Sequence, residues 1–280
     1  MNVLSLFDGI SCGMVALNNN KIKVDSYDAF EIDENAIKIS KYNYPFIKHH
    51  GDVLNADFSK FKNYELLLGG SPCTYWSSAR TDGKRETEIT GCGIDLFNKY
   101  VDALNIIKPK YFLYENNATI SNKIKQYITD KLGVDGVYIN SSEFSAQNRN
   151  RVYWTNITIL PHIDENIYFK DVINFDKNVF KPVGYWVYNS WGEKRKIDTL
   201  KDINALKSST LTTSKTHPGN YYLSLDRKFY TNLTVEQWEQ LQTLPSGYVN
   251  NVNIKESCKY KAIGNGWTIK VIEHILGGII

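Results

Sequence analysis

Hydrophobic and polar positions follow two alternating patterns over the first 160 residues. Short continuous apolar runs, such as Leu66–Leu68, are typical of strands buried within a parallel sheet. Between them lie amphipathic stretches with apolar residues at helical spacing, such as Ile94–Ile107. This alternation predicts an α/β domain in which helices cover both faces of a mostly parallel sheet. The expected strands are Val3–Phe7, Tyr27–Ile32, Ile47–His50, Glu65–Gly70, Tyr111–Tyr114, Val137–Phe144 and Arg151–Ile157, and the expected helices are Gly13–Asn19, Glu34–Asn43, Ile94–Ile107 and Ile120–Leu132.

The pattern changes after Pro161. Residues 162–208 mix aromatic side chains with lysines and show no clear period, which predicts a separate small lobe. Helical patterns return around Thr234–Leu244 and Thr268–Leu276. The chain therefore divides near residues 160 and 208.

Composition narrows the class of protein only slightly. The 280 residues are 42% hydrophobic and carry a net charge of +3, which suits a globular chain and gives little indication of a polyanionic partner. The N-terminus shows no secretory signal, and no apolar run approaches the roughly 20 residues of a membrane span. The histidines and cysteines lack the spacing of metal ligands. We expect a reduced cytosolic protein without a metal, whose four cysteines, Cys12, Cys73, Cys92 and Cys258, are free thiols.

A glycine-containing turn, Leu6–Gly13, separates the first predicted strand from the first predicted helix. Such a turn lets the backbone approach a ligand at the helix N-terminus. Glu31 ends the second strand, where an acid commonly holds ribose hydroxyls, and Asp52 follows the third. These features fit a nucleotide site and a plain tight turn with a solvated acid equally well.

The segment Gly69–Cys73 follows the buried strand Leu66–Leu68. Cys73 should therefore lie at the carboxyl end of the sheet, where ligands bind in this architecture. A cysteine beside a rigid Ser-Pro turn can be an activated thiolate. Taken alone, a buried structural cysteine is the more common reading.

Two further charged motifs follow. Glu115 ends the fifth strand and should point into the same crevice, where a carboxylate can exchange a proton or accept a hydrogen bond. Arg149 and Arg151 stand two residues apart, which predicts that they share one face of a strand and bind phosphate or carboxylate. Solvated charges would explain either motif as well.

The order of all these motifs resembles the DNA (cytosine-5) methyltransferase family, of the compact bacterial or phage type. The likeness covers the chain apart from residues 162–208. It implies a Rossmann-like S-adenosylmethionine-dependent fold with residues 1–160 as catalytic and cofactor-binding domain, 161–208 as target-recognition region, and 209–280 returning to complete the catalytic domain. The motifs are LFDGISCG, Glu31, Asp52, GGSPC, YEN, QNRNR, TLT at Thr210–Thr212 and GNG at Gly264–Gly266.

The resemblance assigns roles to individual residues. Phe7 would lie against the adenine of S-adenosylmethionine, Glu31 would bind the ribose hydroxyls, and Asp52 would receive the adenine amino group. Other residues implied to bind the cofactor are Asp8, Gly9, Gly13, Ile32, Val53, Ser71, Pro72, Leu96, Asn265 and Gly266.

The implied reaction is methyl transfer to carbon 5 of a cytosine flipped out of duplex DNA. Cys73 would attack carbon 6, and Glu115 would contact N3 and N4 of the base. Arg149 and Arg151 would steady the base and the active-site loop. The loop after Cys73 is expected to close over DNA, and the chain is expected to act as a monomer on double-stranded DNA. DNA contacts are expected from Ser77, Arg80, Lys84, Arg85, Lys194 and Arg195.

Two departures from the family pattern concern the same crevice. Asn117 replaces the usual valine after Glu-Asn, and Gly266 replaces the usual serine after Gly-Asn. A methyltransferase acting on RNA and a catalytically inactive DNA-binding homologue are the alternatives. The first usually has Pro-Pro-Cys, which is absent here, and the second normally loses the cysteine, the glutamate or the cofactor glycines, which are all present.

Overall fold

The computed structural model describes residues 1–72, 75–76, 85–176, 178–183 and 200–279. These residues form two compact units, each of which draws on separate parts of the chain. The first unit contains Met1–Asn140, Asn150–His162 and the stretch from Ile269 onwards. The second contains Ser141–Arg149 and Ile163–Thr268.

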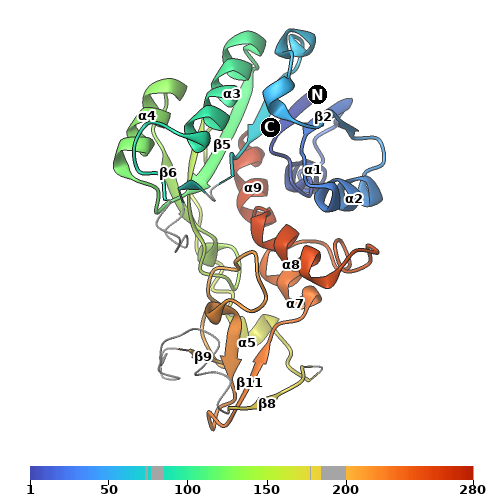
Figure 1. The fold of residues 1–280 in the computed structure, drawn as a ribbon, viewed down its shortest axis with the longest axis vertical. Coiled ribbons are helices and arrows are strands. Elements are labelled where there is room, and N and C mark those ends of the chain that lie inside the picture. Colours follow the sequence, from blue (N-terminus) through green and yellow to red (C-terminus); the bar gives the residue numbers. More distant parts are fainter. Residues whose placement is uncertain (73–74, 77–84, 177, 184–199, 280) are drawn as a thin grey trace. The chain divides into compact units, whose positions relative to one another are not determined.

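A seven-stranded sheet in the order β3-β2-β1-β4-β5-β7-β6 forms the centre of the first unit (Figure 1). Its neighbours from β3 to β5 are parallel, whereas β7 runs antiparallel to both β5 and β6. The predicted α/β fold with a mostly parallel sheet is therefore confirmed. The strands are β1 (Asn2–Leu6), β2 (Ser26–Phe30), β3 (Lys48–His49), β4 (Leu66–Gly69), β5 (Tyr111–Asn117), β6 (Val137–Asn140) and β7 (Asn150–Thr155).

Helices cover both faces of this sheet. Leu4 and Leu6 of β1 join a core shared with α3 and α4, while the intervening Val3 and Ser5 are buried on the opposite side because strand side chains alternate. On that opposite side α1 packs against α9, so the end of the chain completes the first unit (Figure 1). The helices are α1 (Cys12–Asn19), α2 (Glu34–Asn43), α3 (Cys92–Ile107), α4 (Asn122–Leu132) and α9 (Ile269–Leu276), with short 3-10 turns η1 (Val53–Asn55), η2 (Phe58–Phe61) and η7 (Gly277–Ile279).

The second unit is built on a smaller sheet in the order β8-β11-β10-β9. Its core is aromatic: the rings of Phe169 and Tyr222 stack with centroids 4.7 Å apart, and Trp238 meets Tyr260 edge to face at 4.7 Å. The elements are α5 (Phe169–Val172), β8 (Lys181–Pro182), β9 (Lys201–Asp202), β10 (Tyr221–Leu223), β11 (Phe229–Asn232), α7 (Val235–Leu241) and α8 (Glu256–Asn265), with 3-10 turns η4 (Ser141–Glu143) and η6 (Pro218–Asn220).

Several element boundaries differ from the sequence prediction. β5 continues to Asn117, whereas β6 ends at Asn140 and is followed by η4. Of the predicted C-terminal segment 209–280, residues up to Thr268 lie in the second unit and those from Ile269 lie in the first. The functions predicted for these segments remain predictions.

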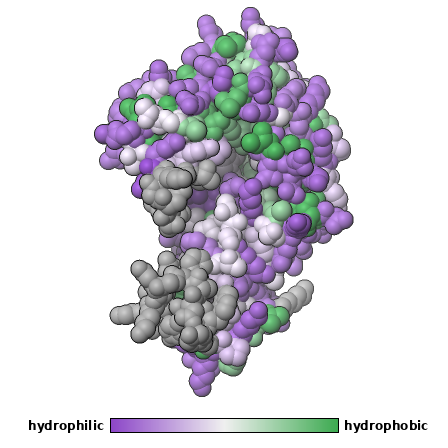
Figure 2. Space-filling model, viewed as in Figure 1, coloured by the Kyte–Doolittle hydropathy of each residue, from purple (hydrophilic) through white to green (hydrophobic). Residues whose placement is uncertain are grey.

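The surface gives little further indication of function. On the face shown in Figure 2 hydrophilic side chains dominate, and apolar side chains are scattered between them. Among the described helices, none has the length and apolar character needed to cross a membrane.

Candidate active site

The strand register brings the predicted motifs to one edge of the first unit's sheet. Leu6 at the end of β1 pairs with Phe30 of β2 and Gly69 of β4, and Gly69 pairs with Tyr114 of β5. β1 and β4 are also the strands at which the strand order reverses, which is where open α/β sheets bind ligands. The residues that follow these four positions are Phe7, Glu31, Gly70 and Glu115.

The loop after β1 has an unusual backbone. Phe7, Gly9 and Ser11 all have φ of 59°, a left-handed conformation that is strained for the two residues with side chains. A Cβ added to Gly9 would meet no atom within 4 Å, so glycine is favoured here by the left-handed backbone conformation and not by lack of space. Left-handed residues concentrated in a loop at the ligand-binding edge favour a functional role for it.

Glu31 holds this loop through backbone hydrogen bonds. Its Oε2 accepts a hydrogen bond of 2.8 Å from the N–H of Gly9, and its Oε1 accepts from the N–H groups of Ile32 and Asp33, both at 2.8 Å. The side chain of Ile32 is 71% exposed beside this fixed carboxylate. An exposed apolar surface next to an oriented acid fits a nucleoside, whose ring is flat and whose sugar hydroxyls donate hydrogen bonds.

Gly13 and Asp8 have structural contacts of their own. A Cβ on Gly13 would lie 2.5 Å from Leu68 Cδ1, so this glycine lets α1 pack closely on the sheet. The Asp8 carboxylate accepts hydrogen bonds from Tyr27 Oη at 2.7 Å and Ser11 Oγ at 2.5 Å. Burial raises the pKa of Asp8, while the hydrogen bonds it accepts act in the opposite direction. Direct contact of either residue with a cofactor remains a prediction.

Asp52, Val53 and Leu96 lie close to the core that α3 shares with the sheet. Asp52 caps η1 by accepting a hydrogen bond of 2.9 Å from the N–H of Leu54. Val53 is buried in this core, and Leu96 and Phe7 are partly buried against it. These contacts leave the predicted adenine contacts untested.

The turn that leads to Cys73 is fixed to β5. Ser71 Oγ lies 2.6 Å from Tyr114 Oη, and Asn116 Nδ2 donates to the carbonyl oxygen of Ser71 at 3.2 Å. Burial raises the pKa of Tyr114 well above its ordinary value, so its phenol keeps its proton. Pro72 follows with an exposed side chain, and Cys73 itself lies outside the described residues.

Glu115 and Arg151 form an ion pair between β5 and β7. Arg151 Nε lies 2.9 Å from Glu115 Oε1, and the two side chains are only 9% and 11% exposed. Arg151 Nη1 also donates to the carbonyl oxygen of Asn150 at 2.9 Å. The guanidinium offsets the cost of burying the carboxylate and fixes its orientation at the sheet edge.

Arg149 has a different environment, so the prediction that both arginines share one strand face is wrong. β7 begins at Asn150, and Arg149 belongs to the second unit, where it is only 3% exposed. Its guanidinium donates to the carbonyl oxygens of Leu211 at 3.2 Å, Gly264 at 3.1 Å and Gly266 at 2.9 Å. A guanidinium hydrogen-bonded to three backbone carbonyls holds three segments of the chain together, which gives Arg149 a structural role.

These carbonyls belong to a buried polar cluster that the sequence did not reveal. Gln242, fully buried, donates to the carbonyl oxygens of Ile263 and Gly266, and its Oε1 accepts from Thr268 and Gln147. Gln147 in turn accepts a hydrogen bond from the N–H of Leu211 at 3.0 Å. The separated QNRNR, TLT and GNG motifs are therefore joined by hydrogen bonds within the second unit.

Glycine is required at one position of the GNG motif. A Cβ on Gly264 would lie 1.9 Å from the carbonyl oxygen of Thr212, which shows how closely α8 approaches the TLT segment. Gly266 has φ of −67°, a value open to any residue, and Asn265 is exposed at the end of α8. The cofactor contacts expected of Asn265 and Gly266 remain predictions.

Asn117, the first departure from the family pattern, has a local role. Its Oδ1 accepts hydrogen bonds from both the N–H and the Oγ1 of Thr119, each at 3.1 Å. This arrangement is an Asx turn, which valine could not form. The substitution therefore stabilises the turn that follows β5.

Of the residues expected to contact DNA, the structure describes Arg85. Its Nε donates to the carbonyl oxygen of Trp76 at 2.9 Å, and its Nη2 donates to the carbonyl oxygen of Thr119. The side chain thus fastens two segments of the first unit, and contact with phosphate remains a prediction. The other five, Ser77, Arg80, Lys84, Lys194 and Arg195, lie outside the described residues.

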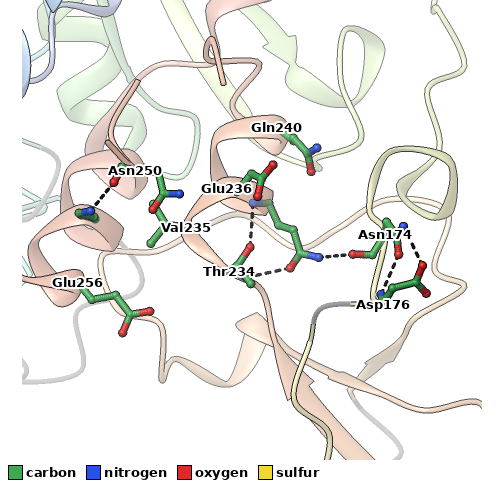
Figure 3. A pocket seen from close by; sticks show the side chains of 10 residues that line it. Asn174, Asp176, Thr234, Val235, Glu236, Gln240, Asn250 and Glu256 are labelled. Carbon is green, nitrogen blue, oxygen red and sulfur yellow. Dashed lines mark hydrogen bonds between the residues drawn. The ribbon is translucent and has the colours of Figure 1, made fainter. Parts of the chain in front are cut away.

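A pocket of about 390 Å³ lies within the second unit, beside α7 (Figure 3). Its walls are mostly polar, and Gln237 in them is already hydrogen-bonded to Asn174 and Thr234. None of the predicted site residues lines it. In the described part of the chain, no three His, Cys, Asp or Glu side chains gather as a metal site would require.

Comparison with known proteins assigns the family. Residues 1–181 match the model of the C-5 cytosine-specific DNA methylase family, and the chain belongs to this family. It is 30% identical over 280 residues to the orphan methyltransferase M.SPRI of Bacillus phage SPR, covering 92% of this chain and 62% of that protein. It is 29% identical over 143 residues to the type II methyltransferase M.NgoBV of Neisseria gonorrhoeae, covering 45% and 33%. The chain thus spans less than two thirds of the length of these relatives.

Solved structures confirm the fold. The S. pombe Dnmt2 methyltransferase superposes with a TM-score of 0.75 at 18% identity, covering 99% of this chain and 97% of that one. The Entamoeba histolytica methyltransferase EhMeth gives 0.73 at 16% identity, covering 100% and 97%. At these identities the likeness concerns the fold alone.

Proposed function

We propose that this chain transfers a methyl group from S-adenosylmethionine to carbon 5 of a cytosine in double-stranded DNA. The observation that carries the proposal is the buried Glu115–Arg151 pair, held at the same sheet edge as the Phe7–Gly13 loop and the Ser71-Pro72 turn. The family match over residues 1–181 supports cytosine as the target. The phage and bacterial relatives favour the cytoplasm of a bacterial or phage-infected cell as the place of action. The chain would act there as a monomer.

The first unit has the features that an S-adenosylmethionine site needs. Glu31 would accept a hydrogen bond from a ribose hydroxyl, since its carboxylate has four lone pairs and backbone N–H groups use three of them, which leaves one. Ile32 and Phe7 would flank the adenine, and the backbone of the turn at Gly9 would approach the methionine part of the cofactor. When bound, the cofactor supplies an electrophilic methyl group on a sulfonium.

The chain's own residues would activate the base. Carbon 5 of cytosine is a weak nucleophile until a thiolate adds to carbon 6, and Cys73, directly after the fixed Ser71-Pro72 turn, is the proposed nucleophile. Glu115 would hold N3 and N4 and stabilise the charge that develops on the ring as the sulfur–carbon bond forms. Carbon 5 then accepts the methyl group, loses its proton to a base, and the thiolate leaves carbon 6.

Arg151 would act on this chemistry through Glu115. Their ion pair fixes one carboxylate oxygen, so the carboxylate is oriented before the base arrives.

A stacked cytosine hides both ring faces, so the target base must leave the helix, at a cost of a few kcal/mol. The second unit, which includes part of the predicted recognition region 161–208, is the proposed reader of the surrounding sequence.

Methyl transfer from labelled S-adenosylmethionine to mixed-sequence duplex DNA tests the proposal. We expect label in 5-methylcytosine with wild type and with Cys92→Ala, whose thiol is exposed at the start of α3, and none with Cys73→Ala. Bisulfite sequencing of the product gives the recognition sequence. If label enters RNA but not DNA, the substrate is RNA and the proposed DNA substrate is wrong. If folded protein labels neither, the proposed methyl transfer to cytosine is contradicted.

A further inference from the structure

Buried hydrogen bonds connect the loop after β1 to two elements away from the expected cofactor contacts. Ser11 Oγ donates to Asp8 Oδ2 at 2.5 Å and lies 2.6 Å from Ser40 Oγ. Ser40 Oγ lies 3.1 Å from His49 Nε2. The connected residues come from the loop, from α2 and from β3, and both serines are fully buried.

The direction of each hydrogen bond follows from the number of protons. Ser11 has one hydroxyl proton and gives it to Asp8, so it must accept from Ser40. Ser40 must then accept from His49, which places the proton of a neutral imidazole on Nε2. His49 Nδ1 is buried and has no hydrogen-bond partner among the described residues, as suits the nitrogen that carries no proton.

Ser11 does not make the helix-capping hydrogen bond that is usual for a serine at its position. It stands directly before α1, where a serine usually accepts a hydrogen bond from the first turn, yet no such bond forms. Its φ of 59° is strained, and so is that of Phe7. The loop therefore needs support from elsewhere, and Ser40 supplies it through the Ser11 hydroxyl.

We propose that Ser40 and His49 are positioning residues that hold the Phe7–Ser11 backbone in the conformation that binds S-adenosylmethionine. This inference rests on the proposed function, because it assigns the loop to that cofactor. Neither residue needs to contact the cofactor, since both act through Ser11 and Asp8. Without the donor chain the strained loop would populate other conformations, and binding would weaken by the fraction lost.

The experiment measures the dissociation constant of S-adenosylmethionine by calorimetry, without nucleic acid, on the full chain. We expect Ser40→Ala and His49→Leu to raise this constant and the KM for S-adenosylmethionine about 3- to 10-fold. This is the effect expected from the loss of one buried hydrogen bond. The kcat at saturating cofactor should change less than about twofold, because the loop is in place once the cofactor is bound. His49→Gln, whose amide can donate in place of the imidazole, should bind more tightly than His49→Leu.

Thr155→Val is the matched control. It removes a hydroxyl that donates to the carbonyl oxygen of Phe112 in the same sheet, so it tests whether loss of any such hydrogen bond weakens binding. We expect its dissociation constant to equal that of wild type. If Ser40→Ala does not fold, the comparison of His49→Leu with His49→Gln carries the test.

The outcomes separate the two proposals. Wild-type affinity in Ser40→Ala or His49→Leu, with methylation intact, would overturn the positioning role and leave the proposed function standing. Equal weakening in Thr155→Val would also overturn it, because the effect would then be general destabilisation. A wild-type chain that does not bind S-adenosylmethionine at all would overturn both.

Discussion

Two arginines of one motif illustrate how differently the two units use the same side chain. Arg151, in the first unit, pairs with Glu115 at the edge of the sheet where the predicted motifs meet. Arg149, two residues earlier, lies in the second unit and donates to three backbone carbonyls. One arginine orients a carboxylate, and the other joins separated segments of chain. Two arginines that are close in the sequence therefore have different contacts in the folded chain.

A similar contrast separates the two polar clusters. In the first unit, Glu31 lies beside the exposed Ile32 and accepts a hydrogen bond from Gly9 in the loop whose Phe7 and Ser11 are strained. Around Arg149, Gln147 and Gln242 are fully buried and bonded mainly to backbone. Backbone strain and an exposed apolar side chain beside the Glu31 carboxylate favour a binding role for that loop, whereas the fully buried glutamines beside Arg149 favour a structural role.

The largest expected effect on stability comes from Arg149→Leu. It leaves the carbonyl oxygens of Leu211 and Gly264 buried without this donor, so the free energy of unfolding in urea should fall by about 3–5 kcal/mol. Lys123→Leu is the control, because its exposed ion pair with Glu88 should contribute less than about 1 kcal/mol. If Arg149→Leu is as stable as wild type and has lost only activity, Arg149 is not a structural residue. The contrast with Arg151 would then fail, and the predicted role of Arg149 in steadying the target base would be supported.

Glu115→Gln should have the largest effect on catalysis. We expect kcat to fall roughly 10²- to 10³-fold, since the group that stabilises developing charge on the base is lost. Stability should also fall, because Arg151 then lies buried without its counter-charge. The double variant Glu115→Gln/Arg151→Met should regain stability but not activity. Recovery of activity in the double variant would show that the pair is structural, like Arg149.

Gly264→Ala tests the close approach of α8 within the second unit. The added Cβ would lie 1.9 Å from the carbonyl oxygen of Thr212, so the helix must shift, at a cost of about 1–3 kcal/mol in the free energy of unfolding. Gly277→Ala is the matched control, since its Cβ would find its nearest neighbour at 3.8 Å. Equal stability of the two variants would contradict the close contact.

The smallest effect concerns pH and His49. Burial is the main cause that lowers the pKa of His49 below its ordinary 6.5, with Lys41 and His50 acting in the same direction and Glu31 opposing them. The unfolded chain therefore binds a proton first as the pH falls, so this residue's stabilising contribution is present above pH 6.5 and is lost below it. The difference in stability between wild type and His49→Gln should shrink from pH 8 to pH 5. A difference independent of pH would show that His49 titrates alike in both states.

Local pattern accounted well for the first unit. Strands such as Leu66–Gly69 are short, apolar and bounded by turn residues, so their side chains alone indicate a buried strand. The second unit was harder to predict: β8 and β9 have two residues each, too few to show a period, and α8 has only a weak apolar stripe. Such elements form because neighbouring chain supplies hydrogen bonds and apolar cover that no local window contains.

By itself, the sequence determined the α/β class, the family, and the order in which the motifs meet the sheet, because apolar periodicity and turn residues are local properties and the motifs are short. Only the tertiary structure decided what each polar group contacts. It assigned Arg149 to three carbonyls, Arg151 to Glu115, and His49 through Ser40 to the loop at Ser11. Hydrogen bonds and ion pairs act over a few ångströms in space, and partners such as Arg149 and Gly266, which are 117 residues apart in the chain, come within that range only once the chain has folded.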